Sequence, residues 1–239
     1  MNVQIFDDVR TLSAELATRV VTEVRLRPSL VLGLPTGRTP LPFYQALRAA
    51  PAVDWSLVRT FNLDEFAGVS AASPASYRAY MQRELFGPMA VADENVGFLN
   101  GTAADLDAEC ERYERAIQAV GGIDLIILGI GGNGHIGFNE PGPDLHARTH
   151  RARLQPGTRA SNAALFGGDA SRVPESALSM GMATILQSKA VVLIATGVAK
   201  AGVVRAMMNG RITPTVPASF LQLHPNVTVM LDREAASRR

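Results

Sequence analysis

Two spacings of apolar residues alternate along this chain. Short, mostly apolar runs recur at residues 30–34, 57–62, 96–99, 123–128, 191–195 and 227–231. Their length and their content of β-branched residues are typical of strands that a sheet buries on both faces. We therefore predict a strand at each of these places.

Helical spacing fills most of the intervals between the predicted strands. The first helix continues from residue 9 until Pro28 ends it, with apolar residues on one face and Asp7 as its predicted N-cap. Further helices are expected at residues 41–49, 77–85 and 105–120, after residue 197, and at 217–223. Residues 158–172 are polar and rich in glycine, and we expect them to be irregular.

Strands that alternate with helices indicate an α/β fold. We predict a Rossmann-like, mostly parallel sheet with right-handed crossovers and helices on both faces. The chain has 239 residues, which suits one large domain, so we expect residues 1–239 to form a single one. The turns at Gly33, Asp64, Gly129 and Gly197 should then gather at one edge of the sheet.

Composition argues against several classes of protein. The formal net charge is +1, which disfavours a nucleic-acid-binding surface and a polybasic membrane patch. Cys110 is the only cysteine, so no intrachain disulfide can form, and its place on a helix face predicts a core position. Residues 1–10 lack the pattern of a signal peptide, and no apolar run has transmembrane length. We expect a cytoplasmic protein.

The segment with the most candidate chemistry is GIGGNGHIGFNEPG, residues 129–142, which directly follows a predicted buried strand. Ligands usually bind where a parallel strand of an α/β sheet ends. Glycines such as Gly129 and Gly137 let the backbone approach a ligand closely, while His135 and Glu140 can move protons. This segment is therefore predicted to form part of an active site.

The spacing of Gly129, Gly131 and Gly134 also fits a dinucleotide-binding fingerprint, which should open a long helix. Residues 141 and 142 are Pro and Gly, which interrupt any such helix. The fingerprint also needs an acidic residue about twenty positions later. The region near Leu154 supplies arginines instead, so we reject nucleotide binding.

Two other strand ends carry candidate anion sites. Residues 35–40, PTGRTP, join a strand to a helix start, where free backbone N–H groups and the helix dipole favour phosphate. The predicted contacts there are Thr36, Gly37, Arg38 and Thr39. Lys200, in the first turn of the helix after residues 191–195, is a second candidate. The alternatives are an ordinary strand–helix turn and an exposed helix lysine.

Two pairs of titratable residues complete the candidates. Asp64 and Glu65 follow a predicted strand, and a buried carboxylate with a raised pKa can act as a general base. The alternative is that Asp64 caps a helix and Glu65 is solvated. His146 and His150 are four residues apart, but nearby arginines and the lack of a third ligand argue against a metal. We therefore interpret both as surface histidines and expect no metal site.

Four segments carry a resemblance to a known family: LPTG at 34–37, FNLDE at 61–65, GHIGFNEPG at 134–142 and LQLHP at 221–225. Over nearly the whole chain they are similar to glucosamine-6-phosphate deaminases, and the third segment is specific. The related 6-phosphogluconolactonases share the fold but look different just after the Gly-His pair. The resemblance implies conversion of glucosamine 6-phosphate and water to fructose 6-phosphate and ammonia, without a metal or organic cofactor.

The resemblance also implies a role for each catalytic candidate. His135 would open the pyranose ring, and Glu140 and Asn133 would orient or tune it. Asp64 would carry a proton between C2 and C1 of the open-chain sugar through an enolamine. An imidazole that titrates near neutral pH and a carboxylate base suit these two tasks. The implied partner is a small amino-sugar phosphate.

Three positions depart from the family pattern. Some members have aspartate where this chain has Asn133, so a relay of acid, histidine and acid is excluded. The family often has a phosphate-holding arginine at the position of Ala164. Arg38 stands where the family usually has a small residue, and we hypothesise that its guanidinium supplies the missing charge.

Three other functions stay open at this point. The missing arginine and the segment PASFL at 217–221 look somewhat like the galactosamine-6-phosphate branch. A hydrolase of the lactonase type would need no base poised over C1 and C2. A non-catalytic sugar-phosphate sensor would not need Asp64, His135 and Glu140 together. The sequence leaves the preferred epimer, the physiological direction and the oligomeric state open, a homo-oligomer included.

Overall fold

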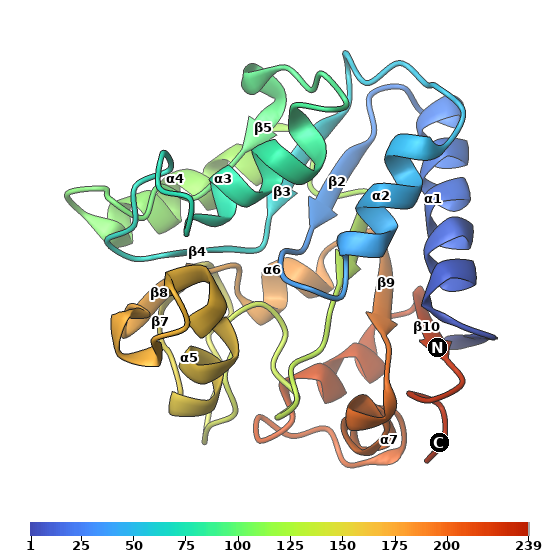
Figure 1. Ribbon diagram of the computed structural model, residues 1–239. Helices are drawn as coiled ribbons and strands as arrows, with labels where there is room; N and C mark the ends of the chain where they lie inside the picture. Colours follow the sequence, from blue (N-terminus) through green and yellow to red (C-terminus); the bar gives the residue numbers. More distant parts are fainter. Residues whose placement is uncertain (239) are drawn as a thin grey trace.

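A parallel sheet forms the centre of the molecule in this computed structural model, which describes residues 1–238 (Figure 1). Its strands are β1 (Asn2–Phe6), β2 (Val31–Leu34), β3 (Arg59–Asn62), β5 (Val96–Gly97), β6 (Leu125–Leu128), β9 (Ala190–Ala195) and β10 (Val227–Asp232). They lie in the order β1-β10-β9-β6-β2-β3-β5, and every neighbouring pair is parallel. The predicted parallel sheet is therefore confirmed.

Helices cover both faces of this sheet (Figure 1). One face carries α1 (Val9–Leu26), α2 (Leu41–Ala49), α3 (Tyr77–Met81) and a π-helical turn, η1 (Gln82–Phe86). The other carries α4 (Leu106–Ala119), α6 (Met182–Leu186), α7 (Ala201–Asn209) and the 3₁₀ segment η6 (Pro217–Leu223). Along β6, Leu125 and Ile127 pack on the first face, whereas Ile126 and Leu128 pack on the second. This alternation explains why a strand buried on both faces reads as an unbroken apolar run.

A second, antiparallel sheet was not predicted. It has the order β4-β8-β7 and consists of β4 (Asp64–Phe66), β8 (Ser176–Ser179) and β7 (His150–Arg153). Two of these strands are polar in sequence, DEF and HRAR, so they lack the apolar pattern that marks a strand. The sheet encloses a separate small core around Phe66, Tyr77 and Phe138.

Two expectations about local structure were wrong, and one strand was not predicted. Asp8, not Asp7, caps α1, because its side chain accepts a hydrogen bond from the backbone N of Thr11 at 2.8 Å. Strand β1 was missed because it is a short edge strand whose residues are only partly buried. The Gly33 position lies within β2 rather than in the turn that follows it.

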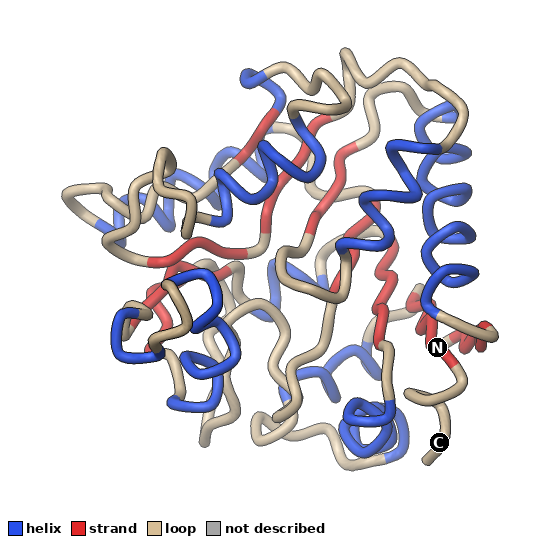
Figure 2. The backbone as a smooth tube through the Cα atoms, in the orientation of Figure 1, coloured by secondary structure: helices blue, strands red, loops and turns tan. Residues whose placement is uncertain are grey.

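Residues 158–172 are largely helical, which corrects the expectation of irregular structure (Figure 2). Helix α5 (Pro156–Asn162) leads into the 3₁₀ segments η3 (Ala163–Phe166) and η4 (Ala170–Arg172). Small and polar residues hide these turns from an apolar periodicity. Arg159 stabilises the segment by donating to the carbonyl oxygens of Val173 and Ser171, both at 3.0 Å.

The strand order reverses between β2 and β6. From β2 the chain adds β3 and β5 on one side, and from β6 it adds β9 and β10 on the other. A crevice opens at such a reversal, beyond the carboxyl ends of the strands, and it is the usual ligand site of an open α/β sheet. The segments after β2 and β6 are therefore placed to share one site. Within residues 1–238 no helix combines the length and apolar character that crossing a membrane requires.

Candidate active site

Four adjacent strands deliver the candidate residues to one edge of the sheet. In spatial order these are β9, β6, β2 and β3, and all run in the same direction. The segments after them carry Lys200, the loop 129–142, the turn 35–40 and Asp64, respectively. The fold thus brings together candidates that lie far apart in the sequence, including Thr36, Gly37, Arg38 and Thr39 in the turn and Gly129 at the start of the loop.

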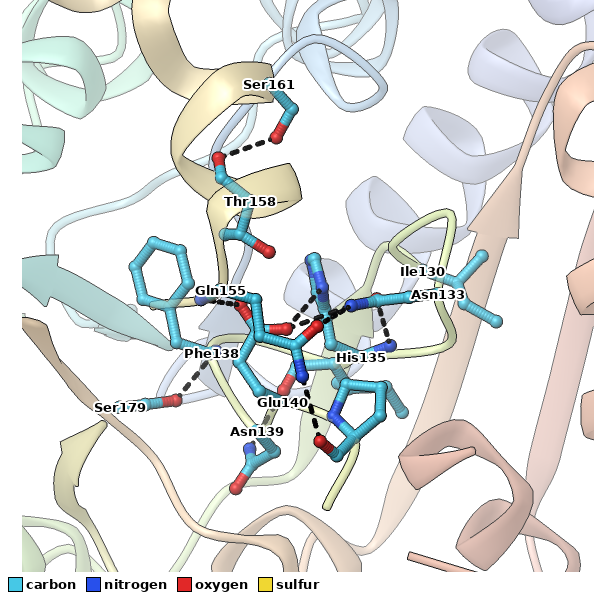
Figure 3. A network of polar contacts seen from close by, with 12 residues as sticks. Ile130, Asn133, His135, Phe138, Asn139, Glu140, Gln155, Thr158, Ser161 and Ser179 are labelled. Carbon is cyan, nitrogen blue, oxygen red and sulfur yellow. Dashed lines mark hydrogen bonds and ion pairs between the residues drawn. The ribbon is translucent and has the colours of Figure 1, made fainter. Parts of the chain in front are cut away.

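Polar contacts join three side chains of the loop after β6 (Figure 3). Glu140 Oε2 lies 3.5 Å from His135 Nδ1 and accepts a hydrogen bond from Asn133 Nδ2 at 3.0 Å. Asn133 Oδ1 in turn accepts the backbone N–H of His135 at 3.2 Å. Burial alone would raise the pKa of Glu140, but hydrogen bonds led by that of His135 hold it below its ordinary value. Glu140 is therefore a carboxylate that can orient the imidazole and stabilise its protonated form.

The imidazole of His135 occupies space that only a glycine at position 131 leaves free. A Cβ atom on Gly131 would lie 2.3 Å from His135 Cε1, which is well inside van der Waals contact. The backbone N–H of Gly131 also donates to the carbonyl oxygen of His135 at 2.9 Å. Gly131 therefore fixes the position of the ring, and this explains one of the glycines in the loop without a nucleotide.

Gln155 also belongs to this network, and the sequence did not indicate it (Figure 3). Its backbone N–H donates to Glu140 Oε1 at 3.3 Å, and its Nε2 donates to the carbonyl oxygen of Pro141 at 2.9 Å. Its Oε1 accepts from Asn133 Nδ2 at 3.3 Å. Gln155 directly precedes α5, so it connects that helix to the loop. No local pattern reveals a contact between residues 22 positions apart.

Asp64 is buried beside the same loop. Its side chain is 6% exposed, and Oδ1 has no hydrogen-bond partner among residues 1–238. A Cβ atom on Gly137, whose φ is +58°, would lie 3.6 Å from Asp64 Oδ2, so the two residues are neighbours. Burial raises the pKa of Asp64 to about 8, the charge of Glu65 adds to this effect, and the hydroxyl of Thr36 opposes it. Such a carboxylate is a strong base when it is ionised.

Glu65 is buried, so the alternative in which Asp64 caps a helix and Glu65 is solvated is wrong. It is Glu65, not Asp64, that caps a helix. Its carboxylate accepts hydrogen bonds from the backbone N–H groups of Phe66, Tyr77 and Arg78 at 2.9, 3.1 and 3.0 Å. It also accepts from Ser76 Oγ at 2.9 Å, at the N-terminus of α3. The two acids therefore differ in role: Glu65 has four donors, whereas Asp64 faces the site with an unpaired oxygen.

The turn after β2 has the features of an anion site. Gly37 has φ +97°, and the backbone N–H groups of residues 37–39 find no acceptor within residues 1–238. Helix α2 begins there without a side-chain cap, so its N-terminal dipole is not compensated. Arg38 is exposed and forms no ion pair with any residue described. The N–H groups of residues 37–39 and the guanidinium of Arg38 are therefore available to bind an anion.

Lys200 adds a second cation to this turn. Its Nζ donates to the carbonyl oxygen of Ile130 at 2.7 Å, which ties it to the loop after β6. Burial lowers the pKa of Lys200, and the nearby charge of Arg38 lowers it further. The two cations repel each other, and neither forms an ion pair within residues 1–238, so together they favour a bound anion.

Two other groups of residues contribute little to this site. His146 is exposed and its ring stacks on that of His150, but His150 is half-buried rather than fully at the surface, and burial lowers its pKa to about 4. Within residues 1–238 no three His, Cys, Asp or Glu side chains form a cluster that could hold a metal ion. Ala164 is exposed on η3 and offers no charge.

Comparisons with known proteins agree over nearly the whole chain. Residues 7–230 match the family model of glucosamine-6-phosphate isomerases and 6-phosphogluconolactonases. A glucosamine-6-phosphate deaminase of Clostridium botulinum (strain Loch Maree / Type A3) is 43% identical over 241 residues, covering 100% of this chain and 98% of that protein. Glucosamine-6-phosphate deaminase 1 of Giardia intestinalis is 46% identical over 224 residues, covering 92% of this chain and 84% of that protein.

Solved structures of other proteins have the same fold as this chain. The structure of a monomeric glucosamine-6-phosphate deaminase superposes with a TM-score of 0.96 at 41% identity, covering 100% of both chains. A 6-phosphogluconolactonase from Trypanosoma cruzi superposes with a TM-score of 0.80 at 18% identity, covering 99% of this chain and 96% of that one. The second likeness, at this low identity, concerns the fold alone.

The raised pKa of Asp64 predicts how an Asp64→Asn variant changes stability with pH. Burial disfavours the ionised form of Asp64 and so raises its pKa from the ordinary value of 3.8 to about 8 in the folded state. The wild type therefore loses stability as the pH rises between these two pKa values. The asparagine variant avoids this loss. We expect its advantage in free energy of unfolding over the wild type to grow by about 1–3 kcal/mol between pH 5.5 and 8.5. Urea titrations at the two pH values measure it.

A matched control is Glu15→Gln, which neutralises an exposed carboxylate on α1. It should show no comparable trend. A constant difference between Asp64→Asn and the wild type at both pH values would contradict the assignment of Asp64 as a buried carboxyl with a raised pKa.

Proposed function

The chain belongs to the family of glucosamine-6-phosphate isomerases and 6-phosphogluconolactonases, and from this premise we propose its activity. It converts glucosamine 6-phosphate and water to fructose 6-phosphate and ammonia, as an enzyme of amino-sugar metabolism. Full-length identity of 43% to a protein of that activity supports the deaminase over the lactonase, whose structure shares 18% of its residues with this chain.

The observation that carries this proposal is the position of Asp64 against the loop of His135 and Glu140. Asp64 lies beside Gly137, midway between these two residues in the loop. The site therefore has a buried carboxylate base, Asp64, and an imidazole, His135, that lies beside a second carboxylate, Glu140. An aldose–ketose isomerisation with ring opening needs both groups, whereas lactone hydrolysis or simple binding needs fewer.

In the first step, His135 opens the sugar ring. The imidazole moves a proton between the C1 hydroxyl and the ring oxygen, so that the C1–O5 bond breaks and an open-chain aldehyde forms. Glu140 lies beside Nδ1 and stabilises the imidazolium that forms in passing. Asn133 holds Glu140 in place, because its amide donates to the carboxylate oxygen that faces the imidazole.

In the second step, Asp64 moves a proton along the open chain. Its carboxylate takes the proton from C2, and the electron pair forms the C1–C2 double bond of an enolamine. The C1 carbonyl oxygen gains the proton that the ammonium group at C2 releases. Asp64 then returns its proton to C1, which leaves an imine at C2. Water adds to that imine, ammonia leaves, and a ketone remains. One base that reaches both carbons is enough for the transfer.

We assign the phosphate to the turn after β2. The free N–H groups of residues 37–39, the hydroxyls of Thr36 and Thr39, and the cations Arg38 and Lys200 support this assignment. Arg38 supplies the charge that Ala164 lacks. The oxygens of a phosphate can accept two parallel hydrogen bonds from one guanidinium, and this makes arginine an effective replacement from another segment.

Three properties stay predictions. Because all four site segments follow strands of one sheet, we expect residues 1–239 to act as a single catalytic domain with one active site. We also expect a cytoplasmic location from the solitary Cys110. The oligomeric state stays open, although the structural relative described above is a monomer.

The direct test is an assay with glucosamine 6-phosphate and galactosamine 6-phosphate in parallel, with ammonia and ketose phosphate as readouts. We expect equal amounts of ammonia and fructose 6-phosphate from the gluco sugar. Asp64→Asn should lower that rate by about 10²–10⁴-fold, because it removes the base. Turnover of the galacto sugar alone would move the protein to the other branch. Hydrolysis of 6-phosphogluconolactone that survives in Asp64→Asn, with no ammonia release by the wild type, would favour a lactonase.

The assignment of Arg38 predicts a defect in substrate affinity. Arg38→Ala removes a charged hydrogen-bond donor, so KM for glucosamine 6-phosphate should rise roughly tenfold or more, with a smaller change in kcat. The matched control is Arg10→Ala, which removes an exposed arginine from α1. Steady-state kinetics of both variants at one salt concentration measure the effect, and an unchanged KM in Arg38→Ala would exclude a phosphate contact.

A further inference from the structure

We propose that Glu65 is a positioning residue that keeps the base Asp64 and the phosphate turn, residues 35–40, at a fixed separation. This inference rests on the proposed function, since it concerns the two ends of one bound phosphosugar. Within residues 1–238 Glu65 forms no hydrogen bond with the loop 129–142 or with the turn, and it acts through α3. The contacts of Glu65, α3 and Tyr80 carry the proposal.

Glu65 is anchored more firmly than any solvated acid could be. It is 1% exposed, and all four of its hydrogen-bond partners donate to its two oxygens. Three of them, Ser76 Oγ and the backbone N–H groups of Tyr77 and Arg78, belong to the start of α3. A carboxylate that only accepts suits the ionised form, although burial raises the pKa of Glu65. The side chain therefore fixes α3 to β4.

The position of Glu65 also determines that of Asp64. The two are adjacent in β4, so their side chains point to opposite sides of the strand. Strand β4 has three residues and pairs with β8 on one side only. Such a short edge strand has few ladder hydrogen bonds to hold it. Rotation of the backbone at Glu65 would turn Asp64 away from Gly137, and the contacts with α3 prevent that rotation.

Helix α3 transmits this anchor to the phosphate turn. Tyr80 lies one turn beyond Tyr77, and its hydroxyl donates to the carbonyl oxygen of Gly37 at 2.7 Å. Tyr80 is 4% exposed, so water does not replace this bond readily. Gly37 is the residue of the turn with positive φ, and its carbonyl orientation determines where the adjacent N–H groups point. Asp64, Glu65, α3 and the turn thus form one continuous chain of contacts.

The charge of Glu65 also reaches Asp64. The loop 129–142 faces Asp64 and carries His135 and Glu140. The ionisable groups whose charges interact with that of Asp64 are Glu65 on its own strand, Tyr44 of α2, Tyr77 of α3 and Tyr113 of α4. Burial holds the pKa of each of these tyrosines well above its ordinary value, so they stay neutral at working pH. Glu65 is therefore the one charged neighbour in this set, and its loss should make Asp64 easier to ionise.

Tyr80→Phe tests the link to the phosphate turn. It removes one hydroxyl and keeps the ring, so we expect KM for glucosamine 6-phosphate to rise about three- to tenfold while kcat changes less than about twofold. The matched control is Tyr113→Phe, which removes a hydroxyl bonded to the carbonyl oxygen of Asn62, outside the turn. Both variants should lose similar thermal stability, but only Tyr80→Phe should raise KM.

Glu65→Gln tests the effect on the base. The NH2 group of the new glutamine faces backbone N–H groups that need an acceptor, so stability falls. Loss of the negative charge makes Asp64 easier to ionise, so the acidic limb of the pH profile of kcat/KM should move to lower pH by about half a unit or more. A purely structural role would lower stability and leave that limb in place.

The outcomes separate the inference from the function. If the wild type releases ammonia from glucosamine 6-phosphate but Tyr80→Phe keeps the wild-type KM, the inference is wrong and the function stands. If the Glu65→Gln variant folds and the acidic limb of its kcat/KM profile stays at the wild-type pH, the inference is also wrong and the function stands. If Glu65→Gln does not fold, the comparison of Tyr80→Phe with Tyr113→Phe decides. A wild type without deaminase activity would overturn both the inference and the function.

Discussion

The burial of Asp64 without a cation is the constraint around which the site is arranged. A carboxylate paired with arginine or lysine would have a lowered pKa and would be a weak base, whereas one exposed to water would compete with solvent. Taking an unpaired carboxylate out of water costs several kcal/mol, which the rest of the fold must offset. The antiparallel sheet, the glycine at 137 and the anchored Glu65 together keep Asp64 dry and close to the loop of His135.

The sequence predicted the framework of this site because parallel strands leave a strong signal. Strands β2, β6, β9 and β10 lie within one or two residues of their predicted bounds, and α2 has the predicted ones. Strands buried on both faces must be apolar throughout, and their carboxyl ends must meet at one edge. The places of Asp64, His135 and Lys200 relative to the sheet followed from these two rules alone.

The remaining parts of the site depend on contacts that no local pattern contains. The polar strand β4 becomes a strand only because β8, more than a hundred residues later, pairs with it. The backbone N–H of Gln155 donates to Glu140, fifteen residues earlier, and the sequence around neither residue indicates this contact. A solvated Glu65 stayed open as an alternative because three of its four hydrogen-bond donors lie eleven to thirteen residues further along the chain. Buried polar residues look like surface residues in a sequence until their donors are known.

The distribution of charge in the site follows from the charges of the proposed substrate. Glucosamine 6-phosphate carries an ammonium group at C2 and a phosphate at C6, and the site has opposite charges at two separate places. Arg38 lies in the turn after β2 with Lys200 near it, whereas Asp64 lies beside the loop 129–142 and Glu140 lies on that loop. With the phosphate at the turn, we expect C1 and C2 to lie beside the carboxylates, which attract the ammonium and repel a second phosphate. A phosphorylated lactone has no cation for these carboxylates. The separation of charges therefore favours an amino sugar, and the same separation requires that Asp64 and the turn do not move independently.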